Sequence, residues 1–242
     1  MRIALISDLH GNAVALDAVL ADIARVGVDR IACLGDVANL GVAPVQVVET
    51  LESLGCVCIQ GNHDAFLLQP ELVHTYTEAP VIVESVAWCR ERLSAAHLAF
   101  LASFRESAEL ELAPGVRLLL FHGSPRSNVE DLLATTPPDD VDALLAGQTA
   151  TAMAFGHTHI QMLRQHRGTL LVNPGSVGVP FLEHVGGRQP VPMGHAEYAT
   201  METQHGGVAV ALRRVAVDAD AAKTQALASD HPLRQMWAHQ YR

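Results

Sequence analysis

The 242-residue sequence has little positive charge and almost no lysine. Lys223 is its single lysine, and 16 basic residues stand against 26 acidic ones, which gives a formal net charge of −10. Proteins that follow a nucleic-acid backbone display clustered Lys and Arg. Nucleic-acid binding is therefore not expected, and we interpret the scarcity of lysine as a compositional bias toward arginine.

The sequence also lacks long apolar runs and has only four cysteines. No run approaches the ~20 residues that a membrane-spanning helix needs. The first residues, Met1 to Ile6, form a strand-like run with no signal-peptide cleavage pattern, so we expect a cytoplasmic protein without membrane association. The cysteines lie in apolar strand-like or helical stretches, and we expect reduced structural thiols.

What the sequence does contain is typical of a globular α/β protein, with 49% hydrophobic and 17% charged residues. Apolar runs at 3–6, 31–34 and 56–60 are typical of buried strands, and the amphipathic stretches 12–25 and 44–54 predict helices between them. This alternation predicts a parallel or mixed sheet. We expect a single domain over residues 1–242, in which the C-terminal strands and helices of residues 196–242 pack on the rest. Further elements are predicted as helices within 66–105, hairpins at 109–121 and 161–172, a helix at 138–146, a strand at 151–155 and a long loop at 177–193.

Polar side chains with metal-ligand chemistry follow the predicted strands. In open α/β sheets the carboxyl ends of the strands meet at one edge, where ligands bind. The set is too large for one four-coordinate zinc ion, and no cysteine quartet is present. Mixed nitrogen and oxygen ligands suit Mn, Fe or Zn, with Asp36 as a plausible bridge between two ions ~3.5–4 Å apart. The candidate ligands are Asp8, His10, Asp36, Asn62, His122, His157 and His159.

Each of these residues also has an ordinary structural explanation. Asp8 could cap the helix that follows it, and Gly35-Asp36 could form a simple turn. His122, or the pair His157 and His159, could serve only in hydrogen bonding. Five strand ends carrying ligand chemistry in this order make the purely structural explanation a poor one for the set as a whole.

The ordered motifs resemble those of a known family. The blocks are Asp8-x-His10, Gly35-Asp36, Gly61-Asn62-His63-Asp64, His122-Gly123 and Gly156-His157-x-His159. Together they resemble the calcineurin-like metallophosphoesterase superfamily over about residues 2–217, and the N-terminal block and short chain resemble its small bacterial phosphodiesterase branch. The resemblance implies a four-layer α/β/β/α sandwich with mixed sheets. It also implies a metal-dependent hydrolase of phosphodiester bonds, with phosphomonoesters as a second option.

The resemblance further implies roles for the motif residues. One metal would be held by Asp8, His10 and His159, the other by Asn62, His122 and His157, and Asp36 would bridge them. Two divalent transition-metal ions are expected, Mn first, with Fe, Zn, Ni or Mg as alternatives. A hydroxide held between the ions would attack phosphorus, and His63 would donate a proton to the leaving oxygen. We expect Asp64 to orient His63 and raise its pKa.

Six further residues are candidates for substrate contact: Asn12, Asn39, Arg126, Phe181, His184 and Arg188. For the two asparagines, helix-start and turn roles are equally open. The last three lie in the loop 177–195, which could instead pack against the C-terminal helices or a second subunit, so a homodimer is an open option. The segment after Gly35-Asp36 lacks the aromatic residue and the Gly-Pro turn of close relatives. The substrates of those relatives are therefore a poor guide to the substrate of this protein.

The expected partner is a small-molecule phosphate ester. A dinucleoside polyphosphate hydrolase and a phosphoprotein phosphatase are the alternative enzymes, since no specificity motif is evident. A non-catalytic scaffold is a further alternative, because such scaffolds occur in the superfamily. The complete ligand set and the presence of His63 argue against a scaffold.

Overall fold

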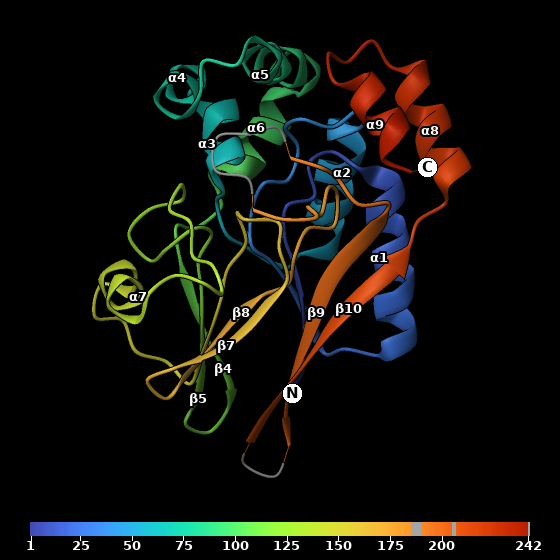
Figure 1. Ribbon diagram of the computed structural model, residues 1–242. Coiled ribbons are helices and arrows are strands. Elements are labelled where there is room, and N and C mark those ends of the chain that lie inside the picture. Colours follow the sequence, from blue (N-terminus) through green and yellow to red (C-terminus); the bar gives the residue numbers. More distant parts are fainter. Residues whose placement is uncertain (185–189, 205–206, 242) are drawn as a thin grey trace.

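The computed structural model describes residues 1–184, 190–204 and 207–241, and consists of two five-stranded sheets with helices against their outer faces (Figure 1). The first sheet has the order β10-β9-β1-β2-β3, and its strands β1, β2 and β3 are parallel, with β9 antiparallel to β1. Its strands are β1 (Arg2–Ile6), β2 (Arg30–Cys33), β3 (Val57–Cys58), β9 (His195–Gln204) and β10 (Gly207–Ala216). The third strand is shorter than the predicted run 56–60, because the Gln60 N–H turns away to the carbonyl of Arg105.

The second sheet has the order β4-β5-β6-β8-β7. Its outer pairs are the two predicted hairpins, and β6 lies between them, parallel to both of its neighbours. All the polar loops that follow β5, β6 and β8 therefore leave the same edge of the sheet. The strands are β4 (Ala108–Ala113), β5 (Val116–Leu120), β6 (Ala152–Ala154), β7 (Met162–His166) and β8 (Thr169–Asn173).

Alternation along the strands explains the layers. On β1, Ile3 and Leu5 are fully buried in the core between the two sheets, whereas Ala4 and Ile6 belong to the core beneath the helices. On the other side, the helix α7 (Pro138–Leu145) covers the outer face of the second sheet. The chain thus forms the expected α/β/β/α arrangement. The helices over the first sheet are α1 (Ala13–Val26), α2 (Pro44–Leu54), α3 (Asn62–Leu68), α4 (Val73–Tyr76), α5 (Pro80–Arg92) and α6 (Ala95–Ala102).

The C-terminal helices α8 (Ala219–Ala228) and α9 (Arg234–Gln240) lie beside the loops at the carboxyl ends of the strands (Figure 1). Trp237 donates its indole N–H to the carbonyl of Leu40, at 2.7 Å, and Gln240 donates to the carbonyl of Gly178, at 2.9 Å. These contacts fix two loops that border the strand ends. Among the described helices, none is long and apolar enough to cross a membrane.

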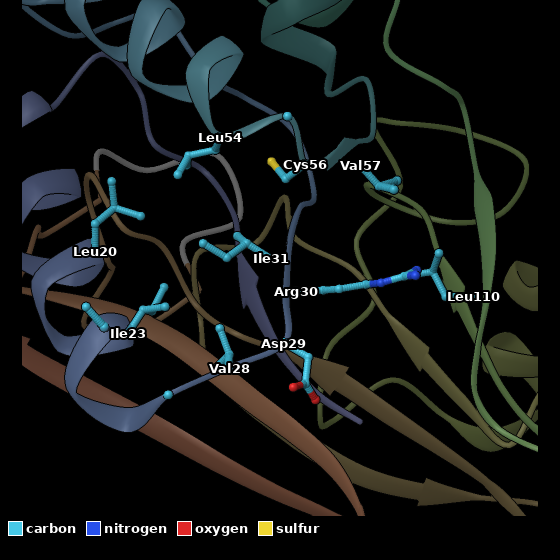
Figure 2. Close-up of a pocket in the computed structure, with 13 residues that line it drawn as sticks. Leu20, Ile23, Val28, Asp29, Arg30, Ile31, Leu54, Cys56, Val57 and Leu110 are labelled. Atoms are coloured by element: carbon cyan, nitrogen blue, oxygen red, sulfur yellow. The ribbon is translucent and has the colours of Figure 1, made fainter.

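A separate cavity of about 660 Å³ lies at the opposite end of the first sheet, where β2 and β3 begin (Figure 2). Its lining is mainly apolar and includes Leu20, Ile23 and Leu54, with Arg30 at its margin. Cys56 also lines it, and its Sγ lies 3.8 Å from that of Cys58. All four cysteines are free thiols, as expected.

Candidate metal centre

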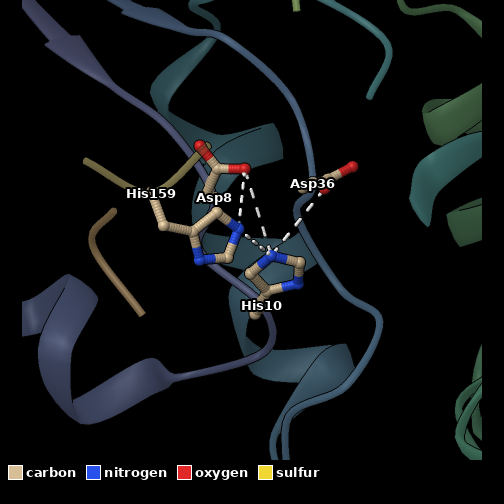
Figure 3. Close-up of side chains that lie close together, drawn as sticks. All are labelled: Asp8, His10, Asp36 and His159. Atoms are coloured by element: carbon tan, nitrogen blue, oxygen red, sulfur yellow. Dashed lines mark hydrogen bonds and ion pairs between the residues drawn. The ribbon is translucent and has the colours of Figure 1, made fainter. Parts of the chain in front are cut away.

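The structure brings all seven expected ligands together at the carboxyl edge of the sheets, and each is at most 9% exposed. Among the residues that the structure describes, two groups of side chains have ligand atoms within 4.8 Å of one another. The first group is Asp8, His10, Asp36 and His159 (Figure 3), and the second is Asp36, His122 and His157. Asn62 joins the second group, because its Oδ1 lies 3.1 Å from His122 Nε2 and 3.1 Å from His157 Nδ1. Asp36 is common to both groups.

The backbone at this edge is strained. Asp8, His10, Asp36, His157 and His159 all have a positive φ, between 44° and 69°. A non-glycine residue in this region costs of the order of 1–3 kcal/mol and persists where the surrounding structure imposes it. Five of the seven candidate ligands therefore have a backbone conformation that the surrounding structure imposes, and this conformation sets the direction of their side chains.

The motif glycines allow the loops to approach one another. A Cβ on Gly61 would lie 2.0 Å from Asp36 Oδ1, and one on Gly156 would lie 1.9 Å from Ser7 Oγ. Both contacts are far shorter than van der Waals distance, so only glycine fits at these two positions.

Backbone carbonyls set the tautomers of three histidines. The Nδ1 atoms of His10, His159 and His122 lie 3.0, 2.8 and 2.6 Å from the carbonyls of Asn39, Val179 and Leu34. A carbonyl only accepts a hydrogen bond, so each Nδ1 carries the proton. Each Nε2 therefore points toward the carboxylates as the ring nitrogen that can bind a metal, which is the arrangement that orients histidine ligands in metal sites.

The ligand atoms of the first group lie close together around the Asp8 carboxylate. His10 Nε2 lies 3.1 Å from His159 Nε2, and both lie within 4.0 Å of Asp8 Oδ1 (Figure 3). Among the described residues, the fully buried Asp8 Oδ1 has no hydrogen-bond partner. A buried carboxylate oxygen without a partner, surrounded by imidazole nitrogens and a second carboxylate, is a donor set that fits divalent metal ions of the borderline class.

The same electrostatics is evident in the pKa values. Burial alone lowers the pKa of His122, but the Asp36 and Asp8 carboxylates outweigh it and raise the pKa to about 10. Burial likewise opposes the charge on Asp36, yet the surrounding histidines hold its pKa well below the usual value. The carboxylates are thus poised to attract positive charge into the site.

His63 lies beside both groups, and its partner differs from the predicted one. Its ring is 5.1 Å from that of His10, and its Nδ1 is 2.8 Å from Nδ2 of Asn39. The prediction that Asp64 orients His63 is wrong: the two Asp64 oxygens accept hydrogen bonds from the backbone N–H groups of Asp36, Val37 and Gly61, each at 2.9 Å. Asp64 is the third residue of α3, and its side chain folds back to the start of that helix.

The expected rise in the pKa of His63 is also not found. Burial lowers the pKa of His63 to about 3, and the Asp36 carboxylate only partly offsets this. Asp64 contributes no charge contact to the ring, and its own pKa is raised to about 7 by burial and by Asp36. The imidazole of His63 is therefore neutral in the free protein.

Comparisons with known proteins agree with this geometry. Residues 1–212 match the calcineurin-like phosphoesterase superfamily domain. The chain belongs to this superfamily. An uncharacterized protein of Methanocaldococcus jannaschii is 32% identical over 193 residues, which cover 74% of this chain and 76% of that protein. The superfamily implies a hydrolase that acts on phosphate esters.

Two solved structures share the fold over nearly the whole chain. A metallophosphoesterase from Sphaerobacter thermophilus is 25% identical and has a TM-score of 0.76, with coverage of 100% of this chain and 98% of its own. A hypothetical protein from Pyrococcus horikoshii has a TM-score of 0.78 at 16% identity, with coverage of 99% and 98%. The second likeness concerns the fold alone.

Asn39, proposed as a substrate contact, is instead fully buried with its side chain bound to His63 Nδ1 and to the Leu40 N–H, and two more of the proposed substrate contacts of this phosphoesterase also have structural partners. Asn12 caps α1, where its Oδ1 accepts from the Ala15 N–H, and its Nδ2 donates to Gly178 and to Tyr241 Oη. Arg126 binds the carboxylate of Glu130 through several hydrogen bonds, the shortest of 2.6 Å. Both side chains are engaged by these partners rather than directed at the ligand groups.

The three candidate substrate contacts in the loop 177–195 have different surroundings. Phe181 stacks on the His159 ring, with centroids 4.3 Å apart, and also packs against the apolar cluster that contains Trp237. His184 Nε2 lies 3.7 Å from Asp131 Oδ2 at the rim. Arg188 lies outside the described residues. The described part of the loop therefore packs on the C-terminal helices, which was the alternative to a substrate-specificity role.

Two residues near the phosphoesterase site were missed from the sequence. The half-exposed ring of Tyr76 lies 6.3 Å from the rings of both His63 and His157. Asp131 lies 3.5 Å from His157 Nε2. Neither residue belongs to a motif, because one lies in a helical stretch and the other in a loop without strand-end character, so nothing local in the sequence marks them.

Proposed function

We propose that this phosphoesterase hydrolyses phosphodiesters of small molecules with the help of two divalent transition-metal ions, manganese being the first choice. The observation that carries this proposal is the sharing of Asp36 between two groups of ligand atoms. Asp36 Oδ2 lies 3.3 Å from His122 Nε2 in the second group and 3.7 Å from His10 Nε2 in the first. A shared carboxylate supports two adjacent cations rather than one.

The first ion would be held by Asp8, His10, His159 and Asp36, and the second by Asn62, His122, His157 and Asp36. When bound, such a pair supplies Lewis-acid stabilisation of the phosphoryl oxygens and a lowered pKa for water. The protein itself contributes buried ligands, with three of the histidines held by backbone carbonyls, so little reorganisation is needed when substrate arrives.

In this proposal His63 acts as the general acid. Its Nδ1 accepts from the Asn39 amide, so its proton resides on Nε2. That Nε2–H would donate a hydrogen bond to the leaving oxygen as negative charge develops there, and an imidazole that passes the proton on would recover it from water. Proton donation of this kind accelerates ester cleavage most when the leaving group is a poor one.

The surroundings support a compact diester over a polyphosphate. Arg126 is neutralised by Glu130, and the acidic Asp131 lies at the rim near His157. Within the part of the chain that the structure describes, a long polyanionic tail would meet this carboxylate. Tyr76, which lies near His63 and His157, offers an aromatic surface for the organic part of a substrate.

The test is hydrolysis of a panel of esters by purified protein before and after chelation and after reloading with Mn²⁺. The panel contains bis-p-nitrophenyl phosphate, p-nitrophenyl phosphate, a dinucleoside polyphosphate and a phosphopeptide. We expect diesters to be cleaved fastest and activity to disappear with the chelator and return with Mn²⁺. Preference for the dinucleoside polyphosphate or the phosphopeptide would establish one of the alternatives, and full activity without metal would refute the proposal.

A further inference from the structure

His63 stands at the end of a buried series of hydrogen bonds that begins in the C-terminal segment. His231, which is 1% exposed and lies between α8 and α9, accepts the Leu233 backbone N–H at its Nδ1, at 2.9 Å. A neutral imidazole that accepts at Nδ1 carries its proton on Nε2. That Nε2 lies 2.9 Å from Ser85 Oγ, so His231 donates to the serine.

The fully buried Ser85 links His231 to Asn39 by hydrogen bonds. Because its oxygen accepts from His231, its hydroxyl proton is free to donate to Asn39 Oδ1, at 3.3 Å. The Leu40 backbone N–H donates to the same Oδ1, at 2.9 Å. Two donors on one atom identify that atom as the amide oxygen, so the other atom of the amide is the NH₂ group.

The amide nitrogen of Asn39 then donates to His63 Nδ1 at 2.8 Å. Every hydrogen bond in the series has one allowed direction, and the last leaves the His63 proton on Nε2. We propose that Ser85 and His231 are positioning residues, which act through Asn39 to hold His63 in the Nε2–H tautomer. This inference rests on the proposed role of His63 as the general acid.

Asn39 also fixes the tautomer of a second histidine, His10, through its backbone carbonyl. Its backbone carbonyl accepts from His10 Nδ1, which leaves the His10 Nε2 lone pair for a metal. Its side-chain amide imposes the opposite tautomer on His63. One residue thereby separates two adjacent histidines into a ligand and a proton donor, and the orientation of its amide decides the second assignment.

Asp230 and His231 contact α5, the helix that carries Ser85. Trp88 on α5 lies edge-on to His231, with ring centroids 4.5 Å apart, and donates to Asp230 at 2.8 Å. Arg92 on the same helix forms two hydrogen bonds with Asp230, at 2.9 and 3.0 Å, and lies over the Trp88 ring. His231 and Ser85 are therefore held in one packed unit. Burial lowers the pKa of His231 to about 4, in keeping with the neutral ring that the series requires.

The direct test is the tautomer of His63, measured by long-range ¹H–¹⁵N correlation spectra of the protein loaded with diamagnetic Zn²⁺. His63 is assigned from the spectrum of His63→Gln. We expect the wild type to show the Nε2–H tautomer, and Ser85→Ala and His231→Phe to show a mixture. Phe keeps the ring contact with Trp88 but cannot donate, and His231→Gln restores a donor and should restore the wild-type spectrum. Ser103→Ala, at an exposed serine on α6's C-terminal cap, is the matched control.

The kinetic test compares leaving groups. p-Nitrophenolate leaves without protonation, whereas an alkoxide needs an acid, so a variant that mispositions the His63 proton slows only the second type of ester. Loss of one hydrogen bond in the series predicts that Ser85→Ala and His231→Phe lower kcat for alkyl esters by about 3- to 10-fold. KM and the p-nitrophenyl rate should change little, whereas the thermal midpoint should fall because each substitution leaves a buried hydrogen-bond donor without an acceptor.

The outcomes are separable from failure of the proposed function. If the wild type cleaves no ester, the proposed function fails, but the spectra still decide the tautomer. A wild-type His63 with its proton on Nδ1 would overturn the inference. So would unchanged spectra and unchanged leaving-group dependence in both variants, or an equal loss on both classes of ester.

Discussion

Replacing Asp64 should destabilise the protein rather than disable a proton donor. The buried Asp64 carboxylate accepts three backbone hydrogen bonds, from Asp36, Val37 and Gly61. Asp64→Ala leaves three buried N–H groups without an acceptor, at about 1–3 kcal/mol each. Water entering the vacated space would recover part of this, so we expect a loss of about 3–6 kcal/mol from a total of about 5–15 kcal/mol.

Asp64→Asn sharpens the test. Oδ2 of Asp64 accepts from both Asp36 and Gly61, whereas Oδ1 accepts from Val37 alone. The asparagine oxygen can keep the first two bonds, but its NH₂ group then faces the Val37 N–H. We expect a loss of about 1–3 kcal/mol for this single unmet donor, offset in part because the amide removes the charge that burial and Asp36 disfavour.

The assay is equilibrium unfolding in urea, followed by the fluorescence of the two tryptophans, with Zn²⁺ at saturation and again with chelator. The midpoint should fall in the order wild type, Asn, Ala, with an unchanged slope. The His63 tautomer should stay the same in the folded Asn variant. A variant of full stability that has lost the His63 tautomer would refute this reasoning and restore the idea that Asp64 orients His63.

Three further results are expected. Asp36→Asn should lose bound metal and activity together, because it removes the carboxylate shared by both ligand groups; elemental analysis should find about two ions per wild-type chain, and retained metal in the variant would contradict the bridging role. His63→Gln should lower turnover by ~10²–10⁴ with little loss of metal, and a normal rate would point to another acid. Phe181→Ala should lower the thermal midpoint and reduce kcat/KM equally for a small and a large diester, because the ring packs on His159 and near Trp237; a selective loss on the large diester would instead establish a specificity role.

The site residues that could be predicted from the sequence are those that directly follow a predicted strand. Asp8, Asp36 and His122 each follow a short apolar run, and the edge at which parallel strands end brings such residues together whatever the intervening sequence. The sheet layers were predictable for the same reason, since alternation along β1 divides its side chains between two cores.

The remainder depends on contacts that no local pattern encodes. The positive φ of His10 and of His159 comes from surrounding loops, since neither residue favours that conformation by itself. Asp64 was assigned to His63 from adjacency in sequence, but the first turn of a helix directs an acidic side chain back to its own backbone. Ser85 and His231 are 146 positions apart in the sequence. They meet because the residues that precede α9 pack on α5.

The dependence of the site on residues 231–241 has a consequence for biosynthesis. Trp237 binds the loop at Leu40, Gln240 binds the loop at Gly178, and the hydroxyl of Tyr241 accepts from Asn12. These three anchors are translated after every candidate ligand, so the loops at Asn12, Leu40 and Gly178 lack these contacts until residues 237–241 have been made. The loops that border the candidate ligands should therefore reach their final arrangement only after this segment has been made.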